Sequence, residues 1–366
     1  MADYSIVLAT AYGQRIKLLT QTQRITYTLT VNQIGAAQID VTGLNNSLFQ
    51  EDSRLEIWRQ VPGGRKYLEG DTCWFIRDWD NTTTRRGSVY TRLIAYSANY
   101  ALDAPIVAYK SQTSYATKAD YADDLIKAII RENLGSSATD TDRDLSAYIS
   151  VDADTSDGPS TAKSFSFRNV LATLREIAQD ADGNGTPLFF GLTYNPDTGL
   201  FTFSTRTQQW GVDHTESGLG RVVLSTRNGT LSEVTRGYIS SGERNYIYVG
   251  GQGQESERNV VEVEDSVRIG VSPFNRRELF INASNTNDTD ELTAEGDAAL
   301  KSYRPIEVLS AKTRDTESIR YGREYKFGDR VVTEHNGRTV GARVDSVQVR
   351  VERGREDISV ELRADE

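Results

Sequence analysis

Short runs of alternating apolar and polar residues, separated by turn residues, most strongly limit what this chain can fold into. One run covers residues 25–32, where the apolar side chains Ile25, Tyr27, Leu29 and Val31 alternate with Thr26, Thr28, Thr30 and Asn32. Such alternation is typical of a strand with one face in a core and the other in water. About seven strands of this kind are expected in the first hundred residues, which favours a β-barrel or sandwich.

Residues 55–100 form the organising part of this region. Leu55 and Ile57 share one face of the first strand, and Pro62 followed by Gly63 and Gly64 predicts a turn. Two further runs, residues 71–79 and 88–96, complete an antiparallel meander. This meander is a scaffold and carries no catalytic motif.

The second strand of the meander is apolar on both faces. Cys73, Phe75 and Trp79 lie on one face, and Trp74 and Ile76 lie on the other. A strand covered on one side only should alternate cleanly. The second face must therefore be covered either by other parts of this chain or by another subunit. The candidate residues of a subunit or partner interface are Trp58, Trp74, Ile76 and Trp79.

After residue 100 the apolar period changes to three and four residues, which predicts amphipathic helices. We predict one helix over residues 118–134, stopped by Gly135 in the left-handed conformation. A second helix is expected from residue 166 or 167 to 181, and residues 136–163 between the two helices read as a long solvated loop. A short third helix, residues 292–302, is opened by Asp288 with Glu291, or by Thr289.

Strands resume after residue 220. Asn336-Gly337 is a two-residue hairpin signal, and the apolar parity changes near Asp345 and Ser346, as a β-bulge would cause. We therefore divide the chain into an N-terminal β-barrel (1–104), an α+β middle domain (105–225) and an α+β/β segment (226–304). Residues 305–366 are expected to complete a C-terminal β-barrel together with residues 226–264. The fold class is mainly β, with α+β parts between the two barrels.

Few residues suited to catalysis are present. The chain has one cysteine and two histidines, and His214 and His335 are both expected in exposed loops. Cys73 lies among aromatic residues and is expected to be an inert core thiol. A nucleophile–base pair is therefore hard to assemble. We predict no catalytic residue, no metal and no cofactor.

Two other kinds of function stay open. Residues 180–185 match the first half of a calcium loop, with Gly185 at its sixth position, but the twelfth position is Gly191 instead of glutamate. The 52 acidic residues also allow a carboxylate-dependent glycosidase or peptidase, since two carboxylates can meet across loops. The four tryptophans could form a carbohydrate platform.

Composition limits the surroundings of the protein. The net charge of −10 argues against non-specific binding to a phosphate backbone, which needs clustered Lys and Arg. An acidic protein can still line a path for DNA, because repulsion keeps a polyanion from sticking. No run approaches the ~18 apolar residues of a membrane span, and no signal-peptide pattern opens the chain. The single cysteine suits folding in a reducing cytoplasm.

A series of motifs follows one another along the chain. They are residues 54–59 (RLEIWR), 63–64 (GG), 69–70 (EG), 74–79 (WFIRDW), 95–102 (AYSANYAL), 106–109 (IVAY), 122–126 (ADDLI), 275–278 (NRRE) and 320–331 (RYGREYKFGDRV). In this order they resemble phage tail hub proteins, the Gp37-like minor tail proteins of siphophages, which are related in architecture to the baseplate hubs of contractile tails. The loops 136–163 and 211–220 match nothing in that family.

The resemblance implies two tail-tube-like β-barrels with α+β modules between them, assembled as a homotrimeric ring on a sixfold tail tube. Implied partners are the tail tube and distal tail protein, a tail fibre or tip protein, and DNA that passes through without sequence-specific binding. No stable membrane insertion is implied. The protein would be a structural, non-enzymatic part of the virion tail tip or baseplate, assembled in the host cytoplasm. The hub of a phage-derived injection machine is a close variant. Since no fibre, lysozyme or peptidase part follows the last strand, those tasks are expected on other proteins.

Overall fold

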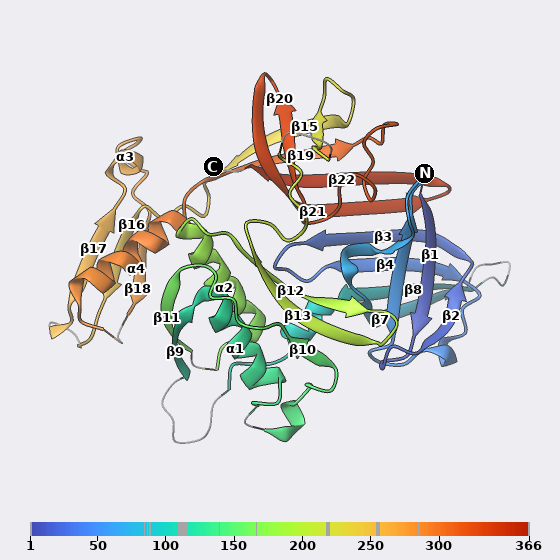
Figure 1. Ribbon diagram of the computed structural model, residues 1–366, viewed down its shortest axis with the longest axis horizontal. Helices are drawn as coiled ribbons and strands as arrows, with labels where there is room; N and C mark the ends of the chain where they lie inside the picture. The colour runs from blue at the N-terminus through green and yellow to red at the C-terminus, as the bar shows by residue number, and fades with distance from the viewer. Residues whose placement is uncertain are drawn as a thin grey trace.

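Strands dominate the structure, with helices confined to its α+β parts (Figure 1). The computed structural model describes residues 2–364 except 84, 86, 88, 109–115, 139, 166, 217–219, 254–256 and 284–285. Residue 109 of the family-like motif 106–109, the predicted helix start at residue 166 and part of the loop 211–220 therefore lie outside the described residues. The prediction of a mainly β fold is confirmed.

The largest element is a 14-stranded sheet built from both ends of the chain. Its N-terminal strands are β1 (Asp3–Ala9), β2 (Arg15–Leu19), β3 (Thr22–Thr30), β4 (Ala36–Thr42), β5 (Arg54–Gln60), β6 (Tyr67–Leu68), β7 (Trp74–Thr83) and β8 (Val89–Ser97). Its C-terminal strands are β14 (Val223–Ser225), β15 (Leu231–Ile239), β19 (Ile306–Thr313), β20 (Arg330–His335), β21 (Arg338–Glu352) and β22 (Arg355–Ala364).

The two groups of strands meet where β3 pairs with β21. The pairing is antiparallel and places Tyr27 opposite Val349. The main path through the sheet is β15-β19-β22-β21-β3-β4-β8-β7-β5-β1-β2. The inward residues of both groups, including Tyr27, Ile39, Trp74, Val347 and Val360, form one hydrophobic core. The two predicted β-barrels therefore share one sheet and one core.

Two local predictions in these strands are confirmed. Asn336 and Gly337 form the β20–β21 hairpin, with positive φ values of 49° and 76° as a type I′ turn requires. The register of β21 against β22 shifts between Val344 and Ser346, which is the predicted bulge.

The middle of the chain folds as an α+β module. It contains β9 (Ala116–Tyr121), α1 (Ala122–Leu134), β10 (Ile149–Val151), β11 (Ser160–Phe165), α2 (Val170–Gly183), β12 (Leu188–Asn195) and β13 (Leu200–Thr207). Leu125, Ile129, Leu174 and Ile177 bring the facing sides of the two helices into a second core.

Three predictions in this module need correction. Helix α1 begins at Ala122 instead of residue 118, because residues 116–121 pair with β11 as a strand. Residues 136–163 are not one long loop, since β10 pairs with β13 and β11 pairs with β9. Gly135 does end α1, but with an extended φ of −111° instead of the left-handed conformation.

A smaller module follows in sequence, at the far side of the molecule from β1 and β2 (Figure 1). It contains β16 (Tyr246–Gly250), β17 (Val260–Glu264), α3 (Ser266–Ile269), β18 (Glu278–Asn282) and α4 (Thr289–Ser302). Asp288 caps α4 by accepting hydrogen bonds from the Asp290 and Glu291 amides, as predicted. Of residues 226–264, assigned from the sequence to the C-terminal barrel, β15 pairs with β19 in the large sheet, whereas β16 and β17 lie in this separate sheet.

Candidate interaction surfaces

The four candidate interface residues occupy three different environments. Trp74 and Ile76 are 0% and 2% exposed and belong to the core of the large sheet. Both side chains are therefore buried within this chain, and their assignment to an interface stays a prediction. Trp58 is half-buried, and its indole N–H donates to Glu56 at 2.8 Å. Trp79 is 50% exposed on β7, with its ring 5.9 Å from that of Phe49.

The second apolar face of β7 is covered by the middle module of the same chain. The ring of Phe75 lies 5.8 Å from that of Phe201 on β13, and the Arg54 guanidinium stacks over both rings. Cys73 is fully buried in the core of the middle module, and burial raises the pKa of its thiol to about 12. Of the two explanations for the doubly apolar strand, coverage by this chain is confirmed, and Cys73 is the predicted core thiol.

The large sheet contains a run of eight antiparallel strands that has an open edge at each end. The run is β15-β19-β22-β21-β3-β4-β8-β7. At one end, β19 is the only strand among the described residues that pairs with β15, which carries Tyr238 and Ile239 with exposures of 58% and 48%. At the other end, β5 pairs with β7 only through Phe75 and Trp74, so within the described residues the rest of β7 has β8 as its only strand neighbour.

A row of alternating charges crosses the polar face of this run. Asp80, Arg92, Asp40, Arg24, Glu352 and Arg355 stand directly opposite one another on six adjacent strands, from β7 to β22. Arg92 lies 3.4 Å from Asp80 and 3.5 Å from Asp40. Arg24 lies 3.7 Å from Asp40 and 3.3 Å from Glu352. The sequence does not reveal this row, because its members come together only through the register of distant strands.

A buried polar cluster joins the N-terminal and C-terminal strands of the chain. The Arg59 guanidinium, on β5, is 0% exposed and donates to Glu356 on β22 at 2.9 Å. It also donates to the Tyr4 hydroxyl at 2.9 Å and to the Tyr321 carbonyl at 2.6 Å. Although burial opposes ionisation, Arg59 holds the pKa of Glu356 below its usual value. The cluster fixes the C-terminal strands to the N-terminal ones.

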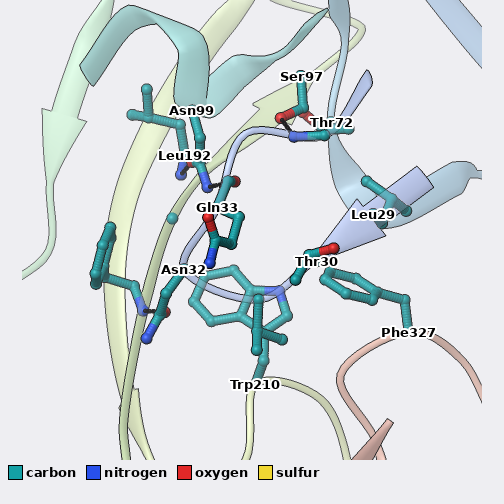
Figure 2. A pocket seen from close by; sticks show the side chains of 15 residues that line it. Leu29, Thr30, Asn32, Gln33, Thr72, Ser97, Asn99, Leu192, Trp210 and Phe327 are labelled. Carbon is teal, nitrogen blue, oxygen red and sulfur yellow. Dashed lines mark hydrogen bonds between the residues drawn. The ribbon is translucent and has the colours of Figure 1, made fainter. Parts of the chain in front are cut away.

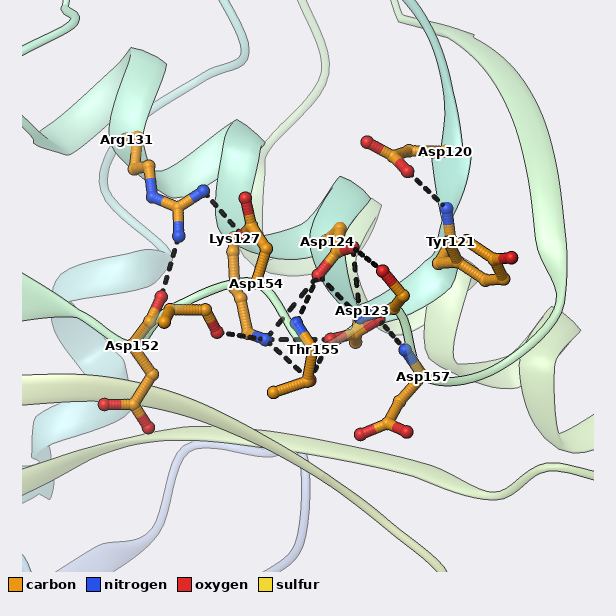
Figure 3. A network of polar contacts seen from close by, with 12 residues as sticks. Asp120, Tyr121, Asp123, Asp124, Lys127, Arg131, Asp152, Asp154, Thr155 and Asp157 are labelled. Atoms are coloured by element: carbon orange, nitrogen blue, oxygen red, sulfur yellow. Dashed lines mark hydrogen bonds and ion pairs between the residues drawn. The ribbon is translucent and has the colours of Figure 1, made fainter.

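A second polar cluster fastens a loop to the start of α1 (Figure 3). The buried Lys127 ammonium lies 2.8 Å from Asp123 and donates to the Ala153 carbonyl at 2.8 Å. Asp123 and Asp124 accept hydrogen bonds from backbone amides of residues 155–157. Burial opposes ionisation of Asp123, yet Lys127 and the Thr155 hydroxyl hold its pKa below the usual range. Because the charged groups pair with one another and with the loop backbone, the role of the cluster is to hold the loop on α1.

A small pocket lies between the turn after β3 and strand β12 (Figure 2). Its cavity volume of about 30 Å³ matches the space of one water molecule. The Asn32 side chain accepts from the Phe190 amide at 2.8 Å, and Asn99 accepts from the Leu192 amide at 2.9 Å. These amide side chains join the N-terminal strands to the middle module and leave no room for a substrate.

A cleft of about 1160 Å³ is bordered by residues of α2, α4 and β18. Lys163 contacts Asp180 and lies 3.0 Å from Glu176 on its wall. Burial raises the pKa of Asp180 and of Glu295, whereas Lys163 and Arg168 keep that of Glu176 below its usual value despite burial. Acidic groups with raised pKa values are what a carboxylate-dependent hydrolase would need. Asp180 and Glu176, however, both pair with Lys163, so we interpret these three side chains as a structural ion-pair group.

The candidate calcium loop and His214 are engaged in other contacts. Asp180 contacts Lys163 and Asp182 pairs with Arg363, so these carboxylates face cations of the protein. Among the described residues, no group of three or more His, Cys, Asp or Glu side chains is placed to hold a metal ion. His214 is 21% exposed, with Nδ1 3.1 Å from the Gly220 carbonyl and Nε2 3.3 Å from Asp329. His214 is therefore less exposed than expected, with a partner at each ring nitrogen, and His335 is half-buried at the end of β20 instead of lying in an exposed loop.

Comparison with protein families places this geometry in context. Residues 80–362 match the family described as Siphovirus ReqiPepy6 Gp37-like protein. The chain belongs to this family. The match covers β8, the middle and small modules and most of the C-terminal strands, and it confirms the resemblance found from the sequence motifs. No curated protein sequence matches the chain.

Solved structures with the same fold come from phage tails and a related secretion machine. The 43 kDa tail protein of prophage MuSo2 from Shewanella oneidensis has a TM-score of 0.57 and 11% identity, covering 98% of both chains. The tail protein of Neisseria meningitidis has a TM-score of 0.59 and 10% identity, covering 99% of this chain and 97% of the other. An Escherichia coli type VI secretion component has a TM-score of 0.50 and 8% identity, covering 94% and 74%.

The chain thus belongs to a siphovirus protein family and shares the fold of phage tail proteins. Its fold is shared over nearly the full length of the two tail proteins, including the strands that run from β15 to β7. No helix among the described residues has the length and apolarity that a membrane crossing requires.

Proposed function

We propose that this protein is a homotrimeric hub at the distal end of a phage tail. In this role it joins the sixfold tail tube and distal tail protein to a tip or fibre protein. Its ring surrounds part of the channel through which DNA leaves the virion. The protein is assembled in the host cytoplasm and has no enzymatic activity of its own. The four-part division of the chain, with boundaries near residues 104, 225 and 304, belongs to this proposal.

The observation that carries the proposal is the eight-strand run in the large sheet. It consists of two groups of four strands, β15-β19-β22-β21 and β3-β4-β8-β7, joined at the β21–β3 pair. Three copies would supply six such groups around one axis, which is the symmetry needed to dock on a sixfold tube. One chain thus offers two similar faces to the tube in each third of the ring.

The direction of the strands supports closure between copies. All pairs in the run are antiparallel. Because the run has an even number of strands, β15 of one copy would meet β7 of the next in the antiparallel sense. Open strand edges bind other strands readily, and Ile239 and Trp79 supply apolar surface at the two edges. The contact is head-to-tail, which closes into a ring when the rotation fits.

The first test is the mass of the protein in solution. Light scattering across a concentration series should give three times the 40.7 kDa chain mass for the protein alone, or three chains bound per complex after addition of the tail tube protein. Ile239→Lys with Trp79→Lys should abolish the trimer, since charge on an edge strand opposes pairing. The melting temperature of the chain should stay near the wild-type value because both side chains are already about half exposed.

The control variant is Val267→Lys, which changes an 80% exposed apolar residue on α3, away from both edges. It should trimerise like the wild type. A wild-type protein that stays monomeric at every concentration, and forms no ring on the tube protein, would contradict the proposal. Loss of the trimer in the control as well would show that the edges are not the contact.

A further inference from the structure

The row of alternating charges described above lies in solvent, on the face of the sheet opposite the core. The side chains of Asp80 and Arg92 are 52% and 46% exposed, and those of Arg24, Glu352 and Asp40 are 35%, 24% and 18% exposed. Their neighbours along β3, at positions 25, 27 and 29, point into the core. The row is therefore the charged part of a polar surface that reaches water.

Opposite charges on adjacent strands stabilise a sheet by roughly 0.2–1 kcal/mol per pair, and salt weakens such exposed pairs. The row of six residues on six strands also has an electrostatic effect on whatever faces this side of the sheet. Hydrogen bonds from Arg350 and Arg24 also hold the pKa of Glu352 below its usual value, so this carboxylate stays charged.

The electrostatic effect of the row is that its charges cancel. Neighbouring strands lie about 4.8 Å apart, which is shorter than the Debye length of about 8 Å at physiological salt. A charged polymer one Debye length above the sheet therefore meets three carboxylates and three guanidiniums as a nearly neutral line. This local balance differs from the chain as a whole, whose net charge is −10.

Double-stranded DNA is the partner for which such a balance matters. Proteins hold DNA mainly by placing Lys and Arg on phosphates and releasing counterions. Arg92 lies between Asp40 and Asp80, and Arg24 lies between Asp40 and Glu352, so each guanidinium is already neutralised from two sides. A phosphate that approaches these arginines has to compete with their carboxylate partners.

We propose that this row faces the path of double-stranded DNA and keeps the DNA from adhering, through arginines masked by cross-strand carboxylates. The inference rests on the proposed hub function, because only a ring would bring three copies of the row around one duplex. It identifies specific carboxylates, Asp40 and Asp80, whose role is to mask a basic residue. The row then acts by charge balance. The net negative charge of the chain would act differently, by repelling DNA.

The test compares two variants that each remove two negative charges. Asp40→Asn with Asp80→Asn strips Arg92 of both partners, while the control, Asp154→Asn with Asp197→Asn, also removes two exposed carboxylates but frees one arginine, Arg131, on the middle module. Binding of a fluorescent linear duplex of about 30 base pairs is measured by anisotropy from low to physiological salt. The row variant should bind about tenfold more tightly than the control at low salt.

Two measurements distinguish the masking of Arg92 from the existence of the ring: the salt dependence of DNA binding, and the binding of linear compared with circular DNA. One uncovered arginine per chain should give a log–log salt slope of about −0.9 for a single chain and about −2.7 for three in a ring. A closed circular duplex cannot thread a preassembled ring, so a trimeric row variant should bind linear DNA and spare circular DNA. Equal binding of both forms with the shallow slope would leave the masking intact but contradict the ring.

The proposal that Asp40 and Asp80 mask Arg92 is refuted if the row variant binds linear DNA no better than the control. Thermal melting of both variants checks folding. If the double variant unfolds, DNA binding by Asp80→Asn is compared with that by Asp154→Asn. Both side chains are 52% exposed, and each pairs with one arginine, Arg92 or Arg131. A smaller but salt-dependent gain in the Asp80→Asn variant alone supports masking, and equal binding of the two single variants rejects it.

Discussion

At the scale of single residues, Arg59 is the charge on which the junction between the two ends of the chain depends. It is completely buried and pairs with Glu356, while Tyr67 and Tyr321 donate hydrogen bonds to the equally buried Glu69. Removing one partner of a buried pair leaves an uncompensated charge, which costs about 3–5 kcal/mol. Arg59→Met should therefore lower the free energy of unfolding by about that amount, measured by chemical denaturation.

The matched control for this prediction is Arg131→Met, which breaks the exposed pair with Asp154 and should cost no more than ~1 kcal/mol. Adding Glu356→Gln to Arg59→Met should restore part of the loss, because the unpaired carboxylate is then neutral. Equal losses in the two single variants would show that Arg59 is not the critical charge.

Sequence reasoning was strongest for single residues whose role is local and weakest for residues paired over distance. The cap at Asp288, the Asn336-Gly337 turn and the buried thiol of Cys73 follow from their immediate neighbours. Arg59 and Glu356 are 297 positions apart, and no local pattern indicates that they meet. For Trp74, periodicity correctly placed its side chain on an apolar face but could not say which part of the protein covers it.

At the scale of elements, the bulge in β21 places the carboxyl group of Asp345 where its ionised form is unfavourable. Asp345 stands at the register shift, and its Oδ1 is buried without a hydrogen-bond partner among the described residues. Burial raises the pKa of Asp345 to about 6, despite the nearby Arg343 and Arg363. The sequence indicated the bulge through its change of parity, but the consequence for Asp345 depends on the packing of β22 and α2.

The raised pKa of Asp345 gives a pH-dependent prediction. The folded state binds the proton more tightly than the unfolded state, whose pKa is about 3.9. The ionised carboxylate therefore costs stability that appears as the pH rises from about 4 and is complete above about 6. Asp345→Asn should stabilise the protein by about 2 kcal/mol at alkaline pH, with little effect near pH 4. A gain of the same size at both pH values would refute the explanation.

Strand pairing also explains why one predicted helix was too long. Residues 118–121 were predicted as the start of the helix, but residues 116–121 gain backbone hydrogen bonds from β11. Pairing partners 39 to 49 positions away outweigh local propensity here, since propensity contributes only tenths of a kcal/mol per residue. The same pairing turned part of the expected loop 136–163 into a strand.

At the scale of the whole molecule, the structure contains cores of different size that should open independently. The small module is held by Ile247, Val249, Ala283, Leu292 and Ala299, whereas the core of the large sheet draws on both ends of the chain. We expect amide hydrogen exchange to be faster in β16, β17 and β18 than in β3 and β21, because local opening exposes less apolar surface. Mass spectrometry of exchanged peptides can resolve these segments.

A substitution in the small core sharpens this prediction. Leu292 is fully buried, so Leu292→Ala should destabilise the module by about 2–5 kcal/mol. Exchange should accelerate in β16, β17 and β18 and stay unchanged at the β3–β21 pair. An equal acceleration at that pair would mean that the two cores unfold as one unit.

The β3–β21 pair has a consequence for how copies of this protein come to be built into a virion. The hydroxyls of Thr30 and Ser346 lie 3.0 Å apart although 316 positions separate them. At a synthesis rate of about 5–20 residues per second, β3 waits roughly 16 to 60 seconds for its partner. Until then, the N-terminal strands carry an unpaired edge in the middle of the future sheet. Translation that stops before β21 yields a chain in which β3 lacks its partner, so the eight-strand run on which the proposed ring depends cannot form.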